Sequence, residues 1–276
     1  MLVRRGAYVP AEVWSASSER DRYLIRMRAF ALVSSMRQVF CLESAAALYG
    51  ADMLGRWPTD LHVLTDRTGG GSSRPGIRRH LLSDSMAVQE IEGLLVTSPA
   101  RTCGDFAVAR PFESAVVTID SMLRVLPALA SADVQSALDG RGDARGIVRA
   151  SRALEFSNGK SESVLESISR VAIHEMGFPA PVLQKEFRDA QGLIGFADFC
   201  WTKDRIIGEA DGAIKYLDER FRGGRPADRV VYDEKRREDR MRRVGRGFAR
   251  WDWAVATDRR SFEKRLTEAG LKRSAA

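Results

Sequence analysis

The sequence has little cysteine and little histidine. Its 276 residues include only three residues of each type. Cys41, Cys103 and Cys200 are scattered, with no paired spacing. This argues against a structural zinc site and fits a reducing cytoplasm. So few histidines also argue against a His-rich metal site.

Long apolar runs are absent as well. No segment approaches the roughly 18 to 20 apolar residues that a membrane span needs, and the opening residues MLVRRGAYVP contain no apolar signal core. We therefore expect a cytoplasmic protein with neither a membrane span nor an export signal. The composition, 44% hydrophobic and 29% charged, is that of a globular protein long enough for two domains.

Positive charge is concentrated in the last quarter of the chain. The net charge is +7, and residues 215–273 alone hold 19 Lys and Arg against 11 Asp and Glu. Such a basic segment is typical of a polyanion partner. The alternative is a solvated helix face in a protein of Arg-rich composition.

Residues 1–155 predict a mixture of helices and strands after an irregular stretch over 1–22. We expect helices over 21–36 and 43–50, the second closed by Gly50, and a strand over 60–65. Residues 68–76 predict a Gly/Ser loop, and 91–107 a strand followed by a helix that starts at Ser98-Pro99. Two or three helices are expected over 112–155.

From residue 156 onward the predicted order is α-β-β-β-α-β. It comprises a helix over 161–177 with Ser161 as N-cap, strands over 182–188, 193–201 and 205–211, a helix over 229–245 and a strand over 248–256. The overall class is therefore α/β. The predicted domains are 1–110, a helical connector over 111–155, and 156–276.

Three carboxylates interrupt the apolar runs of FADFCWTKDRIIGEADG, residues 196–212. Alternation along a strand places Asp198 on one face with Ile194, Phe196 and Cys200. Glu209 and Asp211 share a face of the next strand. If the two strands are antiparallel neighbours, the three acids converge at one end, and Glu166 on the preceding helix leans over the same place.

Clustered carboxylates repel one another unless a cation lies among them. Hard oxygen ligands suit Mg²⁺ or Mn²⁺, and such an ion activates water for attack on a phosphodiester. In the alternative reading, Asp198 and Asp211 cap strand ends and Glu209 pairs with an arginine.

The helix over 229–245 has charged residues on the side that should face the sheet, namely Glu234 and Arg237. Charged side chains at the edge of a buried surface need partners of opposite charge, and a carboxylate of the acid cluster can be the partner of Arg237. The residues that we expect to meet phosphates are Arg236, Arg240 and Arg243. The alternative is a set of i,i+4 ion pairs such as Asp233 with Arg237.

Trp251 and Trp253 alternate in the last predicted strand, where we expect them to pack against the helices. Stacking on nucleic-acid bases is the alternative.

As a set and in order, several segments resemble the PD-(D/E)XK nuclease superfamily, and in particular its branch similar to very-short-patch-repair endonucleases. These are ESISR (166–170), Gln184, GFADF (195–199), IIGEADGAIKY (206–216), EKRREDRMRRVG (234–245) and ARWDW (249–253). The resemblance implies a restriction-endonuclease-like core. It also implies that Glu166 and Asp198 are metal-site acids and that Glu209 is the acid of the third motif.

The chain departs from this family at one position. A lysine usually stands two residues after the third-motif acid and orients the attacking water, but Asp211 stands there in this chain. Three interpretations are open. Lys215 or Lys235 supplies, from a displaced position, the ammonium group that orients the water, or Asp211 is a further metal ligand, or the site is inactive.

The N-terminal part resembles the AbiEi-type antitoxin and transcriptional-regulator family through RRGAYVP (4–10), LESAAALYG (42–50), DLHVLT (60–65) and GLLVTSPARTCGDFA (93–107). RRGAYVP is similar to the end of a wing, so the family's winged helix is expected to be truncated here. Arg101 is a candidate functional residue, with a salt bridge to Asp105 as the alternative.

These observations together predict a metal-dependent DNA endonuclease of bacterial defence or toxin–antitoxin type. The alternative is an inactive DNA-binding antitoxin or transcriptional regulator that uses a nuclease-like fold. RNA as the substrate is a further alternative, and a cognate toxin is an expected partner.

Overall fold

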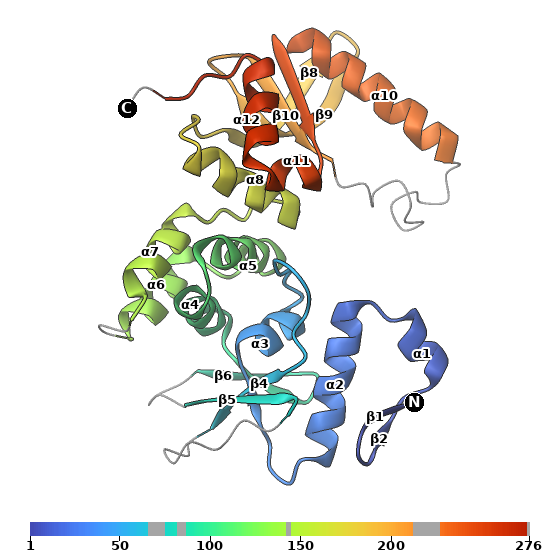
Figure 1. Ribbon diagram of the computed structural model, residues 1–276, viewed down its shortest axis with the longest axis vertical. Coiled ribbons are helices and arrows are strands. Elements are labelled where there is room, and N and C mark those ends of the chain that lie inside the picture. Colours follow the sequence, from blue (N-terminus) through green and yellow to red (C-terminus); the bar gives the residue numbers. More distant parts are fainter. Residues whose placement is uncertain (66–74, 82–86, 142–144, 212–226, 275–276) are drawn as a thin grey trace. The chain divides into compact units, whose positions relative to one another are not determined.

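The computed structural model describes residues 1–65, 75–81, 87–141, 145–211 and 227–274. The chain divides into two compact units, Met1–Gly159 and Lys160–Ala276 (Figure 1). Each mixes helices with β-sheet, which confirms the predicted α/β class. No helix in the described ranges has the length and apolar character needed to cross a membrane.

The first unit is built on a five-stranded mixed sheet of order β5-β4-β3-β7-β6. The strands are β3 (Val39–Phe40), β4 (Leu61–Thr65), β5 (Ile77–Leu81), β6 (Val88–Ile91) and β7 (Leu94–Thr97). Helix α2 (Glu19–Val33) packs on the sheet, because Tyr23 and Met27 share a buried cluster with Phe40, Val63 and Ile77. The predicted helix over 21–36 and strand over 60–65 are thereby confirmed.

Local capping sets the ends of the next helices. Helix α3 (Leu42–Tyr49) ends where Gly50 adopts φ +83°, a left-handed conformation that suits glycine. Helix α4 (Pro99–Ala109) begins at Ser98, whose hydroxyl accepts a hydrogen bond from the backbone N–H of Arg101, with Pro99 in the first turn. Both predicted boundaries are confirmed.

After α4 the described elements of this unit are all helices. The expected helices over 112–155 are α5 (Phe112–Val125), α6 (Ser131–Asp139) and α7 (Ile147–Phe156), which pack with α4. The irregular stretch predicted over 1–22 is wrong, because a short hairpin of β1 (Leu2–Arg4) and β2 (Ala7–Tyr8) precedes α1 (Ala11–Ala16). The Gly/Ser loop predicted over 68–76 falls mostly on 66–74, outside the described residues.

The second unit confirms the predicted order α-β-β-β-α-β. It consists of α8 (Val164–Glu175), β8 (Val182–Asp189), β9 (Gly192–Trp201), β10 (Ile206–Ala210), α10 (Ala227–Val244) and β11 (Gly247–Trp251). The sheet order is β11-β10-β9-β8. Strands β10 and β11 are parallel, and the β8–β9 and β9–β10 pairs are antiparallel.

Helices cover both faces of this sheet. On one face Met241 of α10 packs with Ile194, Ala197 and Ile207. On the other face Trp251 packs against Phe262 of helix α12 (Arg259–Glu268), and its indole N–H donates to Ser169 of α8 at 2.8 Å. The central strand β10 therefore lies between two packed layers, and all five of its residues are buried.

Two boundary predictions in this unit are wrong. Helix α8 is capped by Ser163 rather than Ser161, because the Ser163 hydroxyl accepts from the N–H of Glu166. The last strand ends at Trp251, because Asp252 caps the short helix α11 (Trp253–Thr257) by accepting from the N–H of Val255. Trp253 is consequently a half-exposed helical residue, whereas Trp251 is buried.

Candidate functional site

Gln184 links two of the predicted metal-site acids. Its Nε2 donates to Glu166 Oε2 at 3.1 Å and to Asp198 Oδ1 at 3.3 Å. The second oxygen of Asp198, Oδ2, accepts from the backbone N–H of Ala210 at 2.9 Å. Asp198 is thus held between β8 and β10, with Glu166 one amide away.

Glu166 also has a local structural role. It is buried near the start of α8, where Oε2 accepts from the N–H of Glu162 at 2.8 Å and Oε1 accepts from the Ser163 hydroxyl at 2.9 Å. Together with the bond from the backbone N–H of Glu166 to the Ser163 hydroxyl, these contacts stabilise the first turn of the helix. They fix the Glu166 carboxylate beside Gln184.

The alternation of β9 is not regular, so the predicted common face of Ile194, Phe196, Asp198 and Cys200 is wrong. Ile194 is buried and Phe196 is half exposed, since the β8–β9 register shifts between Phe187 and Arg188. Further along, Ala197 packs toward α10, whereas Phe199, two residues on, packs against Trp251 on the other face.

The alternation of faces therefore breaks at Asp198. The opposing residue on β8 is Gln184, which adopts φ +48°, an uncommon conformation for a residue with a side chain. Backbone irregularities of this kind re-aim side chains and recur beside functional sites. Here the break directs Asp198 toward both neighbouring strands.

Gly208 of β10 is paired with Phe199 of β9. Because the two strands are antiparallel, the next residue of β10, Glu209, lies beside Asp198, the residue before Phe199. The Glu209 carboxylate is buried, and its Oε2 accepts from Arg237 Nη2 of α10 at 2.6 Å. This contact confirms the expected partnership between Arg237 and the acid cluster. It is also the arginine pairing that the alternative reading assigned to Glu209.

Asp211 directly follows β10 and belongs to a chain of charges. Arg250 Nε of β11 lies 3.1 Å from Asp211 Oδ2, and Arg250 Nη1 donates to Glu238 Oε2 of α10 at 2.5 Å. Glu238 also accepts from Arg242, and desolvation and these two arginines shift its carboxyl pKa in opposite directions, with a net lowering. Sequence reasoning missed Arg250, although its register partner on β10 is Glu209.

The remaining predicted groups fall into three classes. Lys215 lies outside the described residues, and so does the side chain of Glu234. Lys235, Arg236 and Arg243 are exposed on α10. Arg240 instead forms a bidentate pair with Asp189, at 2.6 and 2.8 Å, which lowers the pKa of that carboxyl to about 2.

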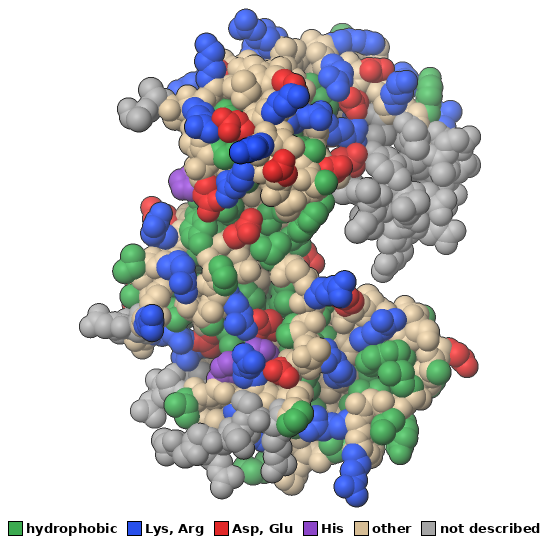
Figure 2. Space-filling view, viewed as in Figure 1, with side chains coloured by type: hydrophobic (Ala, Val, Ile, Leu, Met, Phe, Trp, Pro, Cys, Tyr) green, Lys and Arg blue, Asp and Glu red, His purple; other side chains and the backbone are tan. Residues whose placement is uncertain are grey.

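The outer surface of α10 carries one aromatic ring that sequence reasoning missed. Tyr232 is 54% exposed, and the guanidinium carbons of Arg229 and Arg236 each lie 5.9 Å from its ring centroid. Its spacing of three and four residues from these arginines was the available signal. Figure 2 shows Lys and Arg side chains interspersed with acidic ones over the second unit.

The acids offer only oxygen donors, which is the chemistry that Mg²⁺ and Mn²⁺ prefer. They are nevertheless held by Gln184, Arg237 and Arg250. Among the residues that the structure describes, no group of three or more His, Cys, Asp or Glu side chains is arranged to hold a metal ion. A bound cation would therefore have to compete with these contacts.

The first unit contains a second buried polar cluster. His62 Nδ1 lies 3.0 Å from His80 Nε2 and 3.3 Å from Glu43 Oε2, and Glu43 also pairs with Arg110. Burial lowers the pKa of both imidazoles to about 4. Nearby, Arg101 pairs with Asp105 at 2.6 Å, which confirms the salt-bridge alternative for Arg101.

The comparisons with known proteins find a family match within the first unit. Residues 38–156 match the AbiEi antitoxin C-terminal domain. This antitoxin-like domain spans the sheet strands β3 to β7 and helices α3 to α7, so the expected antitoxin resemblance of the N-terminal part is confirmed.

Two curated relatives align with most of the chain. They are uncharacterized proteins of Mycobacterium tuberculosis, Rv2248 of strain H37Rv and MT2308 of strain CDC 1551. Each is 28% identical over 214 residues, which covers 75% of this chain and 74% of the relative. No solved structure matches the chain significantly.

Proposed function

We propose that the chain is a toxin–antitoxin or defence-type protein whose second unit hydrolyses DNA phosphodiesters with Mg²⁺ or Mn²⁺. The observation that carries this proposal is the placement of Asp198. It is tied through Gln184 to Glu166 on one side and hydrogen-bonded to the end of β10 on the other, between Glu209 and Asp211.

In this proposal Asp198 and Glu209 hold the metal, with Asp211 or Glu166 as a further ligand. The bound ion supplies an activated water and stabilises the charge that develops on the phosphate. Gln184 orients Asp198 through its hydrogen bond, and Arg237 and Arg250 must shift partly from the acids toward the phosphate. Lys235, or Lys215 outside the described residues, orients the water.

The DNA backbone is held by the outward side of α10. Lys235, Arg236 and Arg243 are exposed there, whereas Arg240 is committed to Asp189 and contributes less. Each phosphate neutralised by such a residue releases counterions, so binding weakens steeply as the salt concentration rises.

The experiment is cleavage of supercoiled plasmid and of a labelled single strand by purified wild type, Asp198→Asn and Asp204→Asn, with Mn²⁺, Mg²⁺ or EDTA. Asp204 is the matched control because it is an exposed aspartate between β9 and β10. Cleavage that requires the metal, survives in Asp204→Asn and falls at least a hundredfold in Asp198→Asn supports the proposal. Equal cleavage by wild type and Asp198→Asn contradicts it.

The second candidate is a regulator that binds DNA without cutting it. The ion pairs Arg237–Glu209 and Arg250–Asp211 favour it, because they neutralise the acids without a metal. Salt-sensitive DNA binding by wild type and Asp198→Asn alike, with no cleavage by either, is its expected result. In both versions the antitoxin-like domain recognises a cognate toxin, which is tested by neutralisation of toxin growth arrest with residues 1–159 and with the full chain.

A further inference from the structure

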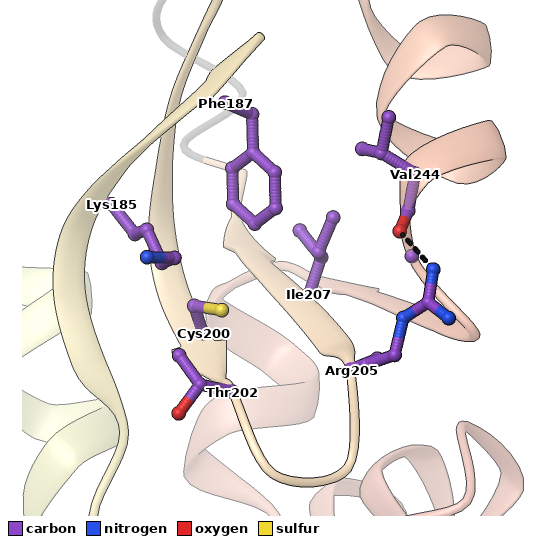
Figure 3. Close-up of a pocket in the computed structure, with 8 residues that line it drawn as sticks. Lys185, Phe187, Cys200, Thr202, Arg205, Ile207 and Val244 are labelled. Atoms are coloured by element: carbon purple, nitrogen blue, oxygen red, sulfur yellow. Dashed lines mark hydrogen bonds between the residues drawn. The ribbon is translucent and has the colours of Figure 1, made fainter. Parts of the chain in front are cut away.

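A pocket of about 240 Å³ opens on the α10 face of the second sheet, two residues along β9 and β10 from the proposed catalytic acids. Figure 3 shows that its walls come from β8, β9, β10, the turn that joins β9 to β10, and the end of α10. The side chains that matter for its chemistry are Lys185, Phe187, Cys200, Arg205, Ile207 and Val244.

The floor of the pocket is apolar. Ile207 is buried, and Phe187 and Val244 are partly buried against the cluster that includes Met241. Figure 3 shows the Phe187 ring and the Ile207 side chain next to each other at its centre. A flat, apolar group has an aromatic face to stack on here.

Two cations lie on opposite sides of this floor (Figure 3). Arg205 Nη2 donates to the carbonyl oxygen of Val244 at 3.2 Å. In the described part of the chain, neither Arg205 nor Lys185 forms an ion pair with a carboxylate. The pocket thus offers two positive charges beside apolar surface, which is complementary to an anion with an apolar body.

We propose that this pocket binds a single nucleotide, with the base against Phe187 and Ile207 at its centre and the phosphate on one of the two flanking cations, Lys185 or Arg205. A phosphate and a carboxylate both accept paired hydrogen bonds from a guanidinium, but a phosphate carries up to two negative charges and a carboxylate only one. Bases of any type stack on an aromatic ring. The pocket is smaller than the roughly 300–1,000 Å³ of drug-sized sites, which limits it to one base.

The nucleotide is either free or the end of a strand, and only the second version rests on the proposed function. Binding and cleavage are separable. If the protein cleaves DNA but does not bind the nucleotide, only the proposal for the pocket is wrong. If it binds the nucleotide but does not cleave DNA, only the proposed nuclease activity is wrong.

The test is isothermal titration of the full chain with dAMP, deoxyadenosine and deoxyribose 5-phosphate. We expect dAMP to bind at least tenfold more tightly than either fragment, since only dAMP fills both halves of the pocket. A single-stranded oligonucleotide with a 5′-phosphate, compared with one lacking it, shows whether a strand end is also accepted; either source of the nucleotide supports the proposal.

The variants are Lys185→Gln and Arg205→Asn, with Lys203→Gln as the control. Asn is chosen because residue 205 has φ +56°, which Asn tolerates. Lys203 is exposed in the same turn and does not line the pocket. The variant of the cation that holds the phosphate should weaken dAMP binding about tenfold, and Lys203→Gln should not change it.

Cys200 gives a second readout that does not depend on a variant. All three cysteines are buried, and of these Cys200 lines the pocket, so bound dAMP should slow the modification of Cys200 by a maleimide and leave the rates at Cys41 and Cys103 unchanged. No saturable dAMP binding, or binding unchanged in both test variants, overturns the proposal. Binding of benzoate without dAMP also overturns it and indicates a peptide carboxylate.

Discussion

Arg237 of α10 places its Nη2 2.6 Å from Oε2 of Glu209, a carboxylate buried in the central strand of the second sheet. The arginine side chain is 27% exposed and that of the glutamate 7%. The pair therefore neutralises a charge that burial would otherwise penalise. The ion pair also determines how mutation of either residue changes the stability of the second unit.

Replacing Arg237 with Gln should destabilise the second unit by roughly 2–3 kcal/mol, because it leaves a buried carboxylate without its main cation. This is below the cost for a fully buried pair because Arg237 is partly in solvent. Urea unfolding followed by tryptophan fluorescence measures the change. Arg236→Gln, at an exposed position of the same helix, should stay within about 0.5 kcal/mol. Adding Glu209→Gln to Arg237→Gln should restore part of the loss, and full additivity of the two changes would argue against a coupled pair.

Gly208 should not tolerate a methyl group. A Cβ at this position would lie 2.7 Å from Cη2 of the Trp251 ring, which packs directly over the strand. Gly208→Ala is expected to cost about 1–3 kcal/mol in thermal or urea unfolding through overpacking.

Gly104→Ala serves as the comparison for Gly208→Ala. Gly104 lies inside α4, and its added Cβ would make an ordinary contact of 3.5 Å with Leu138. That change should stabilise the first unit by about 0.5–1 kcal/mol. A loss of similar size at both glycines would contradict the packing argument.

The histidine pair of the first unit should make stability depend on mildly acidic pH. The pKa values of His62 and His80 fall from 6.5 to about 4 in the folded state, chiefly through burial. Between these values the unfolded chain binds more protons than the folded one, so stability is full above about pH 6.5 and declines as the pH falls toward 4. The melting temperature of wild type should therefore drop between about pH 7 and pH 5.

His80→Gln removes one of the two titrating groups and should flatten this dependence. His62 would keep its buried place beside Glu43, so part of the slope should persist. Identical slopes for wild type and His80→Gln would show that the acid sensitivity arises elsewhere.

Tyr232 should contribute to binding of single-stranded nucleic acid. Its exposed ring lies between Arg229 and Arg236, so a base can stack on it beside two cations. Tyr232→Ala is expected to weaken binding of a labelled single strand at least fivefold, and Tyr232→Phe should leave it near wild type. Anisotropy titrations at two salt concentrations separate stacking from charge, because the alanine variant should retain the salt dependence of wild type. Equal affinity of the alanine and phenylalanine variants would exclude a stacking role.

Much of the second unit could be predicted from the periodicity of its apolar and charged residues. The alternation over 182–211 located three strands, and the charged stripe of α10 predicted that Arg237 faces the sheet, where it meets Glu209. The resemblance of the first half to antitoxins was carried by short segments, and a match over residues 38–156 confirms it.

The backbone irregularities of β8 and β9 could not be predicted from the sequence. The register shift near Phe187, the left-handed backbone of Gln184 and the change of face at Asp198 depend on pairing between strands rather than on local residue type. The last strand was extended too far because ARWDWAVA alternates, although Asp252 stops it as a helix cap. The expected packing of Trp251 against helices is confirmed by its contacts with Phe262 and Ser169, but its close approach to Gly208 is a long-range contact that the sequence did not indicate.

Strand β10 has a neighbour on each edge and a packed layer on each face. Its amide groups can reach solvent only when two ladders and both layers separate together. Amide hydrogen exchange in β10 should therefore be among the slowest in the unit and should follow its global opening. The backbone at Glu209 is therefore rigid. When a phosphate or cation binds, the arginine side chains around Glu209 move instead.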